Sequence, residues 1–164
     1  MWGLDGYPVF TRKEGTDTSY LACARYLLSD FTRGVIYPQF ASHNAHTVSC
    51  ILAMAAEQSS PRDFEFQRLH GMGDALYDTV LEKHRKTVRI YAPVGAHKDL
   101  LPYLVRRLLE NGANSSFVHQ LVDPSVPVES LIDHPVTQLR KFASLANNKI
   151  PLPPAPVSYT HLTL

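Results

Sequence analysis

The sequence predicts an α/β fold in which helices alternate with the strands of a parallel sheet. Three short segments rich in β-branched or aromatic residues are typical of strands, and a helix-like segment follows each of them. This alternation implies right-handed crossovers, so the strands are expected to run parallel in either a doubly wound sheet or a barrel. Polar residues follow each strand, and in both architectures that edge of the sheet binds ligands.

The strands and helices are expected between residues 18 and 110. The three strands are predicted at 35–41, 64–69 and 88–94. The four helices are predicted at 18–29, 46–58, 74–84 and 98–110. Residue types favoured at helix N-caps or in first turns stand at Asp17, Asn44 and Asp74. A closed (β/α)8 barrel usually takes about 250 residues, so in the barrel interpretation the chain is the last part of one.

The segments after residue 116 predict less regular structure. A short helix or turn is expected within 117–135, and a modest amphipathic helix at 136–147. Prolines restrict φ and lack the backbone donor, so 150–156 is expected to be extended. Residues 157–164 show only a faint strand alternation, and we exclude them from the fold prediction as non-native sequence.

Composition narrows the class of protein. The 164 residues carry a formal charge of +1 from interspersed acidic and basic residues, which predicts no contact with nucleic acid. Cys23 and Cys50 stand far apart without a C-x-x-C pair, which favours a reducing compartment over a disulfide scaffold. No apolar stretch approaches the roughly 20 residues that span a bilayer, and no signal peptide is expected.

A polar stripe is expected on the helix at 98–110. Its members recur at i, i+3, i+4 and i+7 and share one face: Tyr103, Arg106, Arg107 and Glu110. The apolar residues of the opposite side are expected to pack firmly: Leu100, Leu101, Leu104, Val105, Leu108 and Leu109. Two adjacent guanidiniums suit a small carboxylate, which they bind through paired donors. The alternative is a solvated face held by weak ion pairs.

Further polar residues stand just after the predicted strands. They are His43 and Asn44, His70 and Gly71, and Gly95 with His97. His43 and His46 have the spacing of a metal pair, but they straddle a strand-to-helix junction and lack a third ligand at a suitable spacing. We therefore predict no metal site.

Five segments, in this order, resemble the C-terminal part of the proline dehydrogenase domain of the bifunctional proline-utilisation flavoproteins. They are GYPVFTRKEGTDTSYLACA, IYPQFASHNAHT, FEFQRLHGMG, RIYAPVG and YLVRRLLENGANSSFV. The resemblance runs from about Gly6 to Ile150. It implies the C-terminal portion of a distorted (β/α)8 barrel at 1–120, a linker toward an absent aldehyde dehydrogenase domain at 121–150, and an extended proline-rich tail at 151–164.

The resemblance also implies an activity and a set of site residues. A noncovalently bound FAD would accept a hydride from L-proline, which becomes pyrroline-5-carboxylate. Arg106 and Arg107 would hold the proline carboxylate, while Tyr103 and Tyr91 would shape the pocket around the ring. The residues implied near the cofactor are Thr11, Lys13, Thr16, His43, Asn44, Gln67, Leu69, Glu110 and Ser116.

Several of these residues have a simpler interpretation. The Thr11-Arg12-Lys13 segment could be a solvated loop, and Gln67 could satisfy a hydrogen bond inside a barrel. Leu69 could be a core residue, and Tyr91 and Tyr103 could be packing residues of amphipathic elements.

The resemblance sets the remaining expectations. The longer protein that carries such a segment, termed the parent, would pass electrons to a membrane quinone, and its homo-oligomerisation is left open. It is expected in the cytoplasm, with peripheral attachment at the inner face of the plasma membrane as an option. Strands that supply further flavin contacts in the family are absent, so the segment alone is expected to be inactive. The rivals are a non-catalytic interaction module and a barrel oxidoreductase for another small amino acid.

Overall fold

The computed structural model describes residues 6–111 and 117–152. These residues belong to two compact units. One unit combines the residues up to Tyr20 with those from Asp133 onward, and the other spans Leu21–Ile132. The sheet and the helices that follow its strands lie in the second unit.

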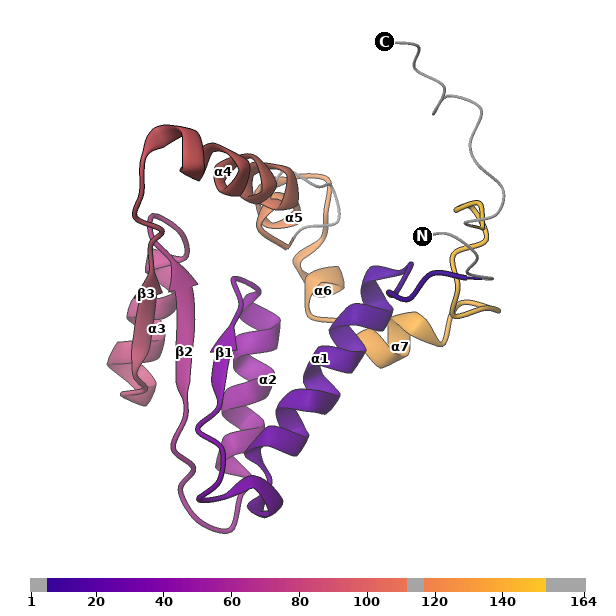
Figure 1. Ribbon diagram of the computed structural model, residues 1–164. Helices are drawn as coiled ribbons and strands as arrows, with labels where there is room; N and C mark the ends of the chain where they lie inside the picture. Colours follow the sequence, from indigo (N-terminus) through magenta and orange to yellow (C-terminus); the bar gives the residue numbers. More distant parts are fainter. Residues whose placement is uncertain (1–5, 112–116, 153–164) are drawn as a thin grey trace. The chain divides into compact units, whose positions relative to one another are not determined.

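The second unit is built on a three-stranded parallel sheet with the order β1-β2-β3 (Figure 1). The strands are β1 (Gln39–Ala41), β2 (Glu65–Leu69) and β3 (Val88–Tyr91). Gln39 pairs with Glu65 across the first pair of strands, and Leu69 pairs with Tyr91 across the second. The predicted parallel α/β sheet is confirmed. Three strands in sequential order agree with a segment of a barrel.

All three predicted strands are shorter in the structure, the second by one residue only, and proline accounts for the larger differences in the first and third. The first begins at Gln39 and not at residue 35 because Pro38 cannot donate to a ladder. The third ends at Tyr91 and not at residue 94, just before Pro93. The side chains of Val35 and Val94, which were predicted within strands, are 83% and 97% exposed.

Four longer helices alternate with the strands as predicted. They are α1 (Lys13–Leu28), α2 (Ala45–Ala56), α3 (Asp74–His84) and α4 (His97–Asn111). Asn44 is the N-cap of α2 and Asp74 lies in the first turn of α3, as expected. The expectation that Asp17 lies at the start of the first helix is wrong. The helix begins at Lys13, and Asp17 forms an i,i+4 ion pair with Lys13 within it.

Shorter elements occupy the segment after α4. They are α5 (Phe117–Val122), α6 (Val128–Leu131) and α7 (Pro135–Leu139). The helix predicted at 136–147 ends at Leu139. Ser144 and Asn147 accept hydrogen bonds from nearby backbone N–H groups, which competes with helical bonding. Only the first two residues of the proline-rich tail, 151 and 152, are described, and they form no helix or strand.

One face of the sheet carries an aromatic core. Phe40 and Phe66 are partners in the β1–β2 register, and Phe64 stands two residues before Phe66 on the same side. The Phe66 ring lies 5.9 Å from that of Tyr77 on α3, centroid to centroid. Burying each such ring is worth about 1.5–3 kcal/mol. This face thus joins β1 and β2 to α3, while α2 lies beside β1 (Figure 1).

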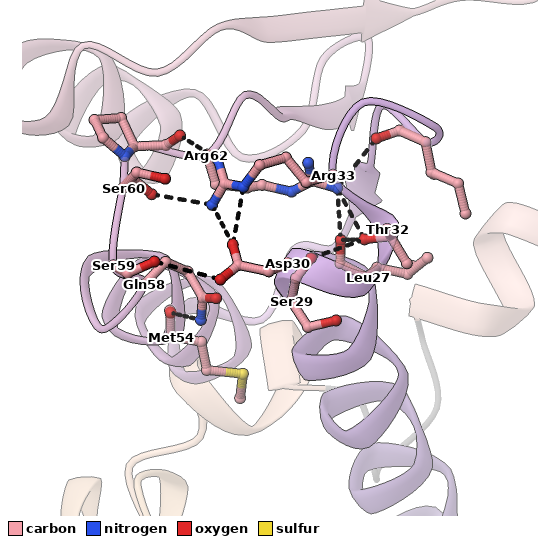
Figure 2. Close-up of polar contacts among 12 residues, drawn as sticks. Leu27, Ser29, Asp30, Thr32, Arg33, Met54, Gln58, Ser59, Ser60 and Arg62 are labelled. Carbon is pink, nitrogen blue, oxygen red and sulfur yellow. Dashed lines mark hydrogen bonds and ion pairs between the residues drawn. The ribbon is translucent and has the colours of Figure 1, made fainter.

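The loops that precede β1 and β2 are tied together by a buried arginine. Arg62 is 5% exposed and lies just before β2. Its Nη2 atom donates to three oxygens, namely Leu27 O at 3.1 Å, Thr32 Oγ1 at 2.9 Å and Ile36 O at 3.1 Å. Figure 2 shows this contact beside the Arg33–Asp30 ion pair of η1 (Asp30–Thr32). A cation at the last turn of α1 also interacts favourably with the helix dipole. This network fixes the amino ends of the strands.

The expectation that the apolar side of α4 packs firmly is wrong for the described residues. Most of its large apolar side chains are 44–73% exposed, namely Leu101, Leu104, Val105, Leu108 and Leu109. Periodicity identifies which side of a helix is apolar, but it does not supply the element that covers it. No helix within the described ranges is long and apolar enough to cross a membrane. Cys23 and Cys50 are both free thiols.

Candidate functional site

The candidate site lies at the carboxyl ends of the three strands, the edge where the sequence predicted ligand binding. His43 follows β1, Leu69 ends β2 and Tyr91 ends β3. The backbone N–H of Leu69 donates to Nε2 of His43 at 3.2 Å. An imidazole nitrogen that accepts a hydrogen bond carries no proton, so the proton of neutral His43 is on Nδ1. The His43 ring therefore presents one donor, at a fixed edge, to whatever binds there.

Burial lowers the pKa of His43 below its ordinary value of 6.5, and the charges around it act in opposite directions. The Glu110 carboxylate raises the pKa, and the Arg68 guanidinium lowers it. Because burial is the largest cause, His43 is held in its neutral form. The influence of Glu110 places the last turns of α4 within electrostatic reach of the loop after β1.

A tight turn before α3 holds His43 from one side, and the sequence interpretation named His70 and Gly71 there but not Gly73 or Tyr77. Gly73 has a φ of +71°, and a Cβ at this position would lie 3.1 Å from Cδ2 of His43. Tyr77 donates its hydroxyl to the backbone oxygens of Ser42 and Gln67, the latter at 3.4 Å. The signal in the sequence was the Gly-Met-Gly string after β2, because a glycine is favoured where φ is positive.

Arg68 closes the same turn and was also missed. Its Nη1 atom donates to the carbonyl of Met72 at 3.0 Å, and its Nη2 atom lies 2.6 Å from Oδ1 of Asp74. The Arg68 side chain is only 13% exposed. Strand alternation predicts that the side chains of Arg68 and Gln67 lie on opposite faces of the sheet. It does not predict that the chain folds back over the Arg68 guanidinium.

The polar stripe of α4 begins against the end of β3. The rings of Tyr91 and Tyr103 have centroids 6.2 Å apart, and the guanidinium carbon of Arg107 lies 5.5 Å from the centre of the Tyr103 ring. Nη1 of Arg107 lies 2.6 Å from Oε2 of Glu110. Four of the predicted residues thus form one cluster. The remaining stripe residue, Arg106, is exposed.

Two polar atoms of this cluster are buried without a partner among the described residues. They are Oη of Tyr103 and Nε of Arg107. A buried polar atom without a hydrogen bond costs about 1–3 kcal/mol, and a ligand that supplies the partner is one explanation for such an atom. Thr18 Oγ1 and Arg62 Nε, outside this cluster, are buried in the same way. The Tyr103 phenol and the Arg107 guanidinium are therefore candidate donors to a small anionic ligand. The solvated helix face remains the alternative, because the side chains of Arg107 and Glu110 are 37% and 58% exposed and their pair has the i,i+3 spacing of that alternative.

The remaining residues on the second unit combine structural contacts with free polar groups. Oδ1 of Asn44 accepts from the N–H groups of His46 at 3.0 Å and Thr47 at 3.3 Å, so only its amide nitrogen is available to a ligand. Nε2 of Gln67 donates to Oε1 of Glu65 at 3.3 Å. This hydrogen bond agrees with the simpler interpretation of Gln67, in which its amide has a structural partner.

A buried carboxylate lies at the centre of the polar face of the sheet, and the sequence interpretation overlooked it. The side chain of Glu65 is 1% exposed. Its oxygens accept from Gln39 Nε2 at 2.8 Å, Gln67 Nε2 at 3.3 Å, Arg89 Nε at 2.6 Å and Arg89 Nη2 at 2.9 Å. The hydrogen bond from Arg89 is the largest cause that lowers the pKa of Glu65. Glu65 is therefore ionised and links all three strands.

Some predicted cofactor residues fall outside this unit. Thr11, Lys13 and Thr16 belong to the other compact unit. Oγ1 of Thr11 accepts from the N–H of Asn147 at 2.8 Å, and Lys13 is paired with Asp17. Ser116 lies outside the described residues.

The structure offers no metal centre within residues 6–111 and 117–152. No group of three or more His, Cys, Asp or Glu side chains in these ranges is placed to hold a metal ion. Nε2 of His46 lies 3.5 Å from Sγ of Cys50, one turn further along α2.

A parallel α/β sheet with polar side chains at its carboxyl edge is an architecture in which many enzymes bind their ligands. The family model described as "Proline dehydrogenase" matches residues 1–120, and the chain belongs to the proline dehydrogenase family.

Sequence and structural similarity to PutA proteins agrees with this family assignment. The chain is 52% identical to the bifunctional protein PutA of Escherichia coli, and the match covers 93% of this chain and 12% of that protein. A crystal structure of PutA from Bradyrhizobium japonicum superimposes with a TM-score of 0.82 at 56% identity, covering 92% of this chain and 15% of that one. PutA from Bdellovibrio bacteriovorus gives a TM-score of 0.73 at 36% identity, covering 80% and 14%. The chain is therefore similar to a small part of these much longer proteins.

Proposed function

We propose that this chain is part of an FAD-dependent proline dehydrogenase that oxidises L-proline to pyrroline-5-carboxylate. The observation that carries the proposal is a pair of donors on α4, Tyr103 Oη and Arg107 Nε, which lie beside the end of β3 and are buried without a partner among residues 6–111 and 117–152. The family match supports it, and the chain spans only 12% of the length of the Escherichia coli relative. The whole activity therefore belongs to the parent.

Arg106 and Arg107 are proposed to bind the carboxylate of proline. A guanidinium presents paired donors that match the two oxygens of a carboxylate. Arg107 is held by Glu110 and by the face of the Tyr103 ring, so its orientation is set before substrate arrives. Arg106 is exposed and is proposed to complete the grip from the outer side.

Tyr91 and Tyr103 are proposed to enclose the ring of proline. Their own ring contact at 6.2 Å fixes a wall at the end of β3. A carboxylate bound at Arg107 and a ring held against this wall would present the same carbon to the cofactor in each turnover. Oxidation removes a hydride from a ring carbon bonded to the nitrogen and a proton from that nitrogen, which leaves a C=N bond.

The residues at the strand ends fit a flavin. His43 offers its Nδ1 proton, Asn44 offers its amide nitrogen, and Gln67 and Leu69 line the same sheet edge. Such a mixture of donors, acceptors and apolar surface suits a large planar ligand. FAD, when bound, supplies the hydride acceptor.

The other proposed contacts with the cofactor complete the set that the sequence resemblance implies. Glu110 contributes from α4 through its pair with Arg107. Thr11, Lys13, Thr16 and Ser116 are proposed as further contacts with the cofactor, as the sequence resemblance implies.

The parent is proposed to be bifunctional and to act in the conversion of proline to glutamate. Electrons would leave the flavin for a membrane quinone at the inner face of the plasma membrane. The two rivals have less support, since a family match that covers most of the chain favours a dehydrogenase over an interaction module. An enzyme for another small amino acid would share the carboxylate grip but differ at the ring wall.

The test is the visible spectrum of the purified full gene product. A yellow protein whose flavin absorbance bleaches on addition of proline would support the proposal. Replacement of both Arg106 and Arg107 by Met should abolish bleaching at proline concentrations that saturate the unaltered protein, while the bound flavin remains. A colourless protein, or bleaching by hydroxyproline but not by proline, would contradict it.

A further inference from the structure

Glu65 has no role in the proposed chemistry, yet its carboxylate accepts four hydrogen bonds on the polar face of the sheet. It lies on β2 two residues before Gln67, so both side chains leave the strand on the same face. The β1–β2 and β2–β3 registers place Gln39 opposite Glu65 and Arg89 opposite Gln67. The four side chains therefore form one polar group across three strands.

We propose that Glu65 is a positioning residue that fixes the amide of Gln67, so that the carbonyl oxygen of Gln67 is directed toward the ligand. An ionised carboxylate accepts hydrogen bonds and donates none. The Glu65 carboxylate can therefore pair only with the NH2 end of the Gln67 amide. The observed hydrogen bond agrees, since Gln67 Nε2 donates to Glu65 Oε1 at 3.3 Å. The opposite end of the amide, Oε1, is left as an acceptor.

The orientation of Glu65 is in turn fixed by Arg89 and Gln39. Arg89 binds both carboxylate oxygens, with Nε at 2.6 Å and Nη2 at 2.9 Å. Gln39 donates from the far side at 2.8 Å. Two parallel N–H···O bonds define the plane of a carboxylate, which a single bond does not. The Gln67 amide is thus held by a group that cannot itself rotate freely.

The consequence is that the site prefers a ligand that donates a hydrogen bond to Gln67. A carbonyl oxygen fixed on this edge accepts from an amide or imide N–H, and a flavin ring has one such N–H group. If the Gln67 amide turned over, two N–H donors would face that group and repel it. This inference rests on the proposed function, because it takes the ligand to be a flavin.

The experiment uses the full gene product, stripped of flavin and titrated with FAD. Glu65→Gln preserves the shape of the side chain but offers NH2 as well as oxygen, so the Gln67 amide is free to turn. We expect the dissociation constant for FAD to rise about tenfold, which is typical when a partner that orients a ligand-binding residue is lost. The visible spectrum of the bound flavin should also shift, because a hydrogen bond to its ring changes.

A double-variant comparison separates positioning from folding. If Glu65 acts through Gln67, then Glu65→Gln added to Gln67→Leu should change the FAD dissociation constant by less than about twofold, since contacts that act as one unit are not additive. Gln39→Leu is the graded comparison, because it removes one donor to Glu65 but leaves both bonds from Arg89, so it should weaken FAD binding less than Glu65→Gln does. If the Glu65→Gln variant folds poorly, the double variant Glu65→Gln with Arg89→Gln takes its place in the FAD titration. The double variant removes the buried charge together with its partner.

The outcomes distinguish the two proposals. If Glu65→Gln weakens FAD binding equally in the unaltered protein and in the Gln67→Leu variant, Glu65 has a structural role only and the inference is overturned. An unchanged dissociation constant and spectrum in Glu65→Gln would also overturn it, with the flavin assignment intact. Failure of the unaltered gene product to bind FAD would overturn the proposed function, and the inference with it.

Discussion

The backbone N–H of Leu69 donates to Nε2 of His43, and this one bond links the end of β2 to the loop that follows β1. It also selects the neutral tautomer with the proton on Nδ1. A second proton on the ring would have to displace Leu69 from Nε2. The bond therefore makes the geometry of the site depend on pH.

Stability should fall as the pH is lowered below the ordinary pKa of His43. The folded protein lowers the pKa of this group from 6.5, so below that pH the unfolded chain binds a proton that the folded protein excludes. Since the unfolded state then binds more protons, stability is full above pH 6.5 and is lost as the pH falls through the folded pKa. Thermal unfolding of the full gene product from pH 8 to pH 5 would measure this loss, and His43→Gln should reduce its slope.

The control for this measurement is His84→Gln, at an exposed position on α3. It should leave the slope of stability against pH as it is in the unaltered protein. A slope that is identical in the unaltered protein and in His43→Gln would show that other groups govern the acid response.

Gly73→Ala should damage the site more than Gly71→Ala does. Both glycines have a positive φ, which costs an L-residue about 1–2 kcal/mol. Only at Gly73 does an added Cβ meet the His43 ring, at 3.1 Å, whereas nothing lies within 4 Å at Gly71. Urea denaturation should therefore show destabilisation in both variants, and FAD affinity should fall further in Gly73→Ala. Equal FAD affinity in the two variants would mean that the close approach to His43 is unimportant.

Asn44 allows helix capping to be separated from ligand contact. Asn44→Ala should cost about 1 kcal/mol of stability, because the N–H groups of His46 and Thr47 lose their acceptor. Asn44→Asp keeps the acceptor but removes the amide donor. If the amide nitrogen contacts the cofactor, Asn44→Asp should retain stability in urea and bind FAD less tightly. Unchanged FAD affinity in this variant would leave Asn44 with its capping role alone.

The sequence was sufficient for features that depend on local pattern. The order of strands and helices, the cap at Asn44 and the one-sided stripe of α4 all follow from spacing and residue type. The carboxyl-edge location of His43 follows from the topology of parallel strands. These features involve neighbours within a turn or a strand, for which periodicity is informative.

The features that were missed depend on contacts between distant segments. Glu65 stands between two phenylalanines and looks like the outward residue of an alternating strand, but Gln39 and Arg89 cover it from the neighbouring strands. The apolar side of α4 was identified correctly, but the prediction that it packs firmly was wrong. Alternation assigns a face and leaves open what lies against it.

Tyr103→Phe should separate stability from substrate binding. The Tyr103 hydroxyl is buried without a partner among the described residues, so its removal relieves a desolvation cost. Ligand-free stability should stay constant or rise by up to about 1 kcal/mol, as measured by urea denaturation of the full gene product. If proline or the flavin supplies the missing partner, kcat/KM for proline should fall by about tenfold, the equivalent of one hydrogen bond. Tyr91→Phe is the comparison, because it removes a hydroxyl from the same wall while keeping the ring, and Tyr91 is 52% exposed. A loss of stability in Tyr103→Phe with full activity would show that the hydroxyl serves the fold and not the ligand.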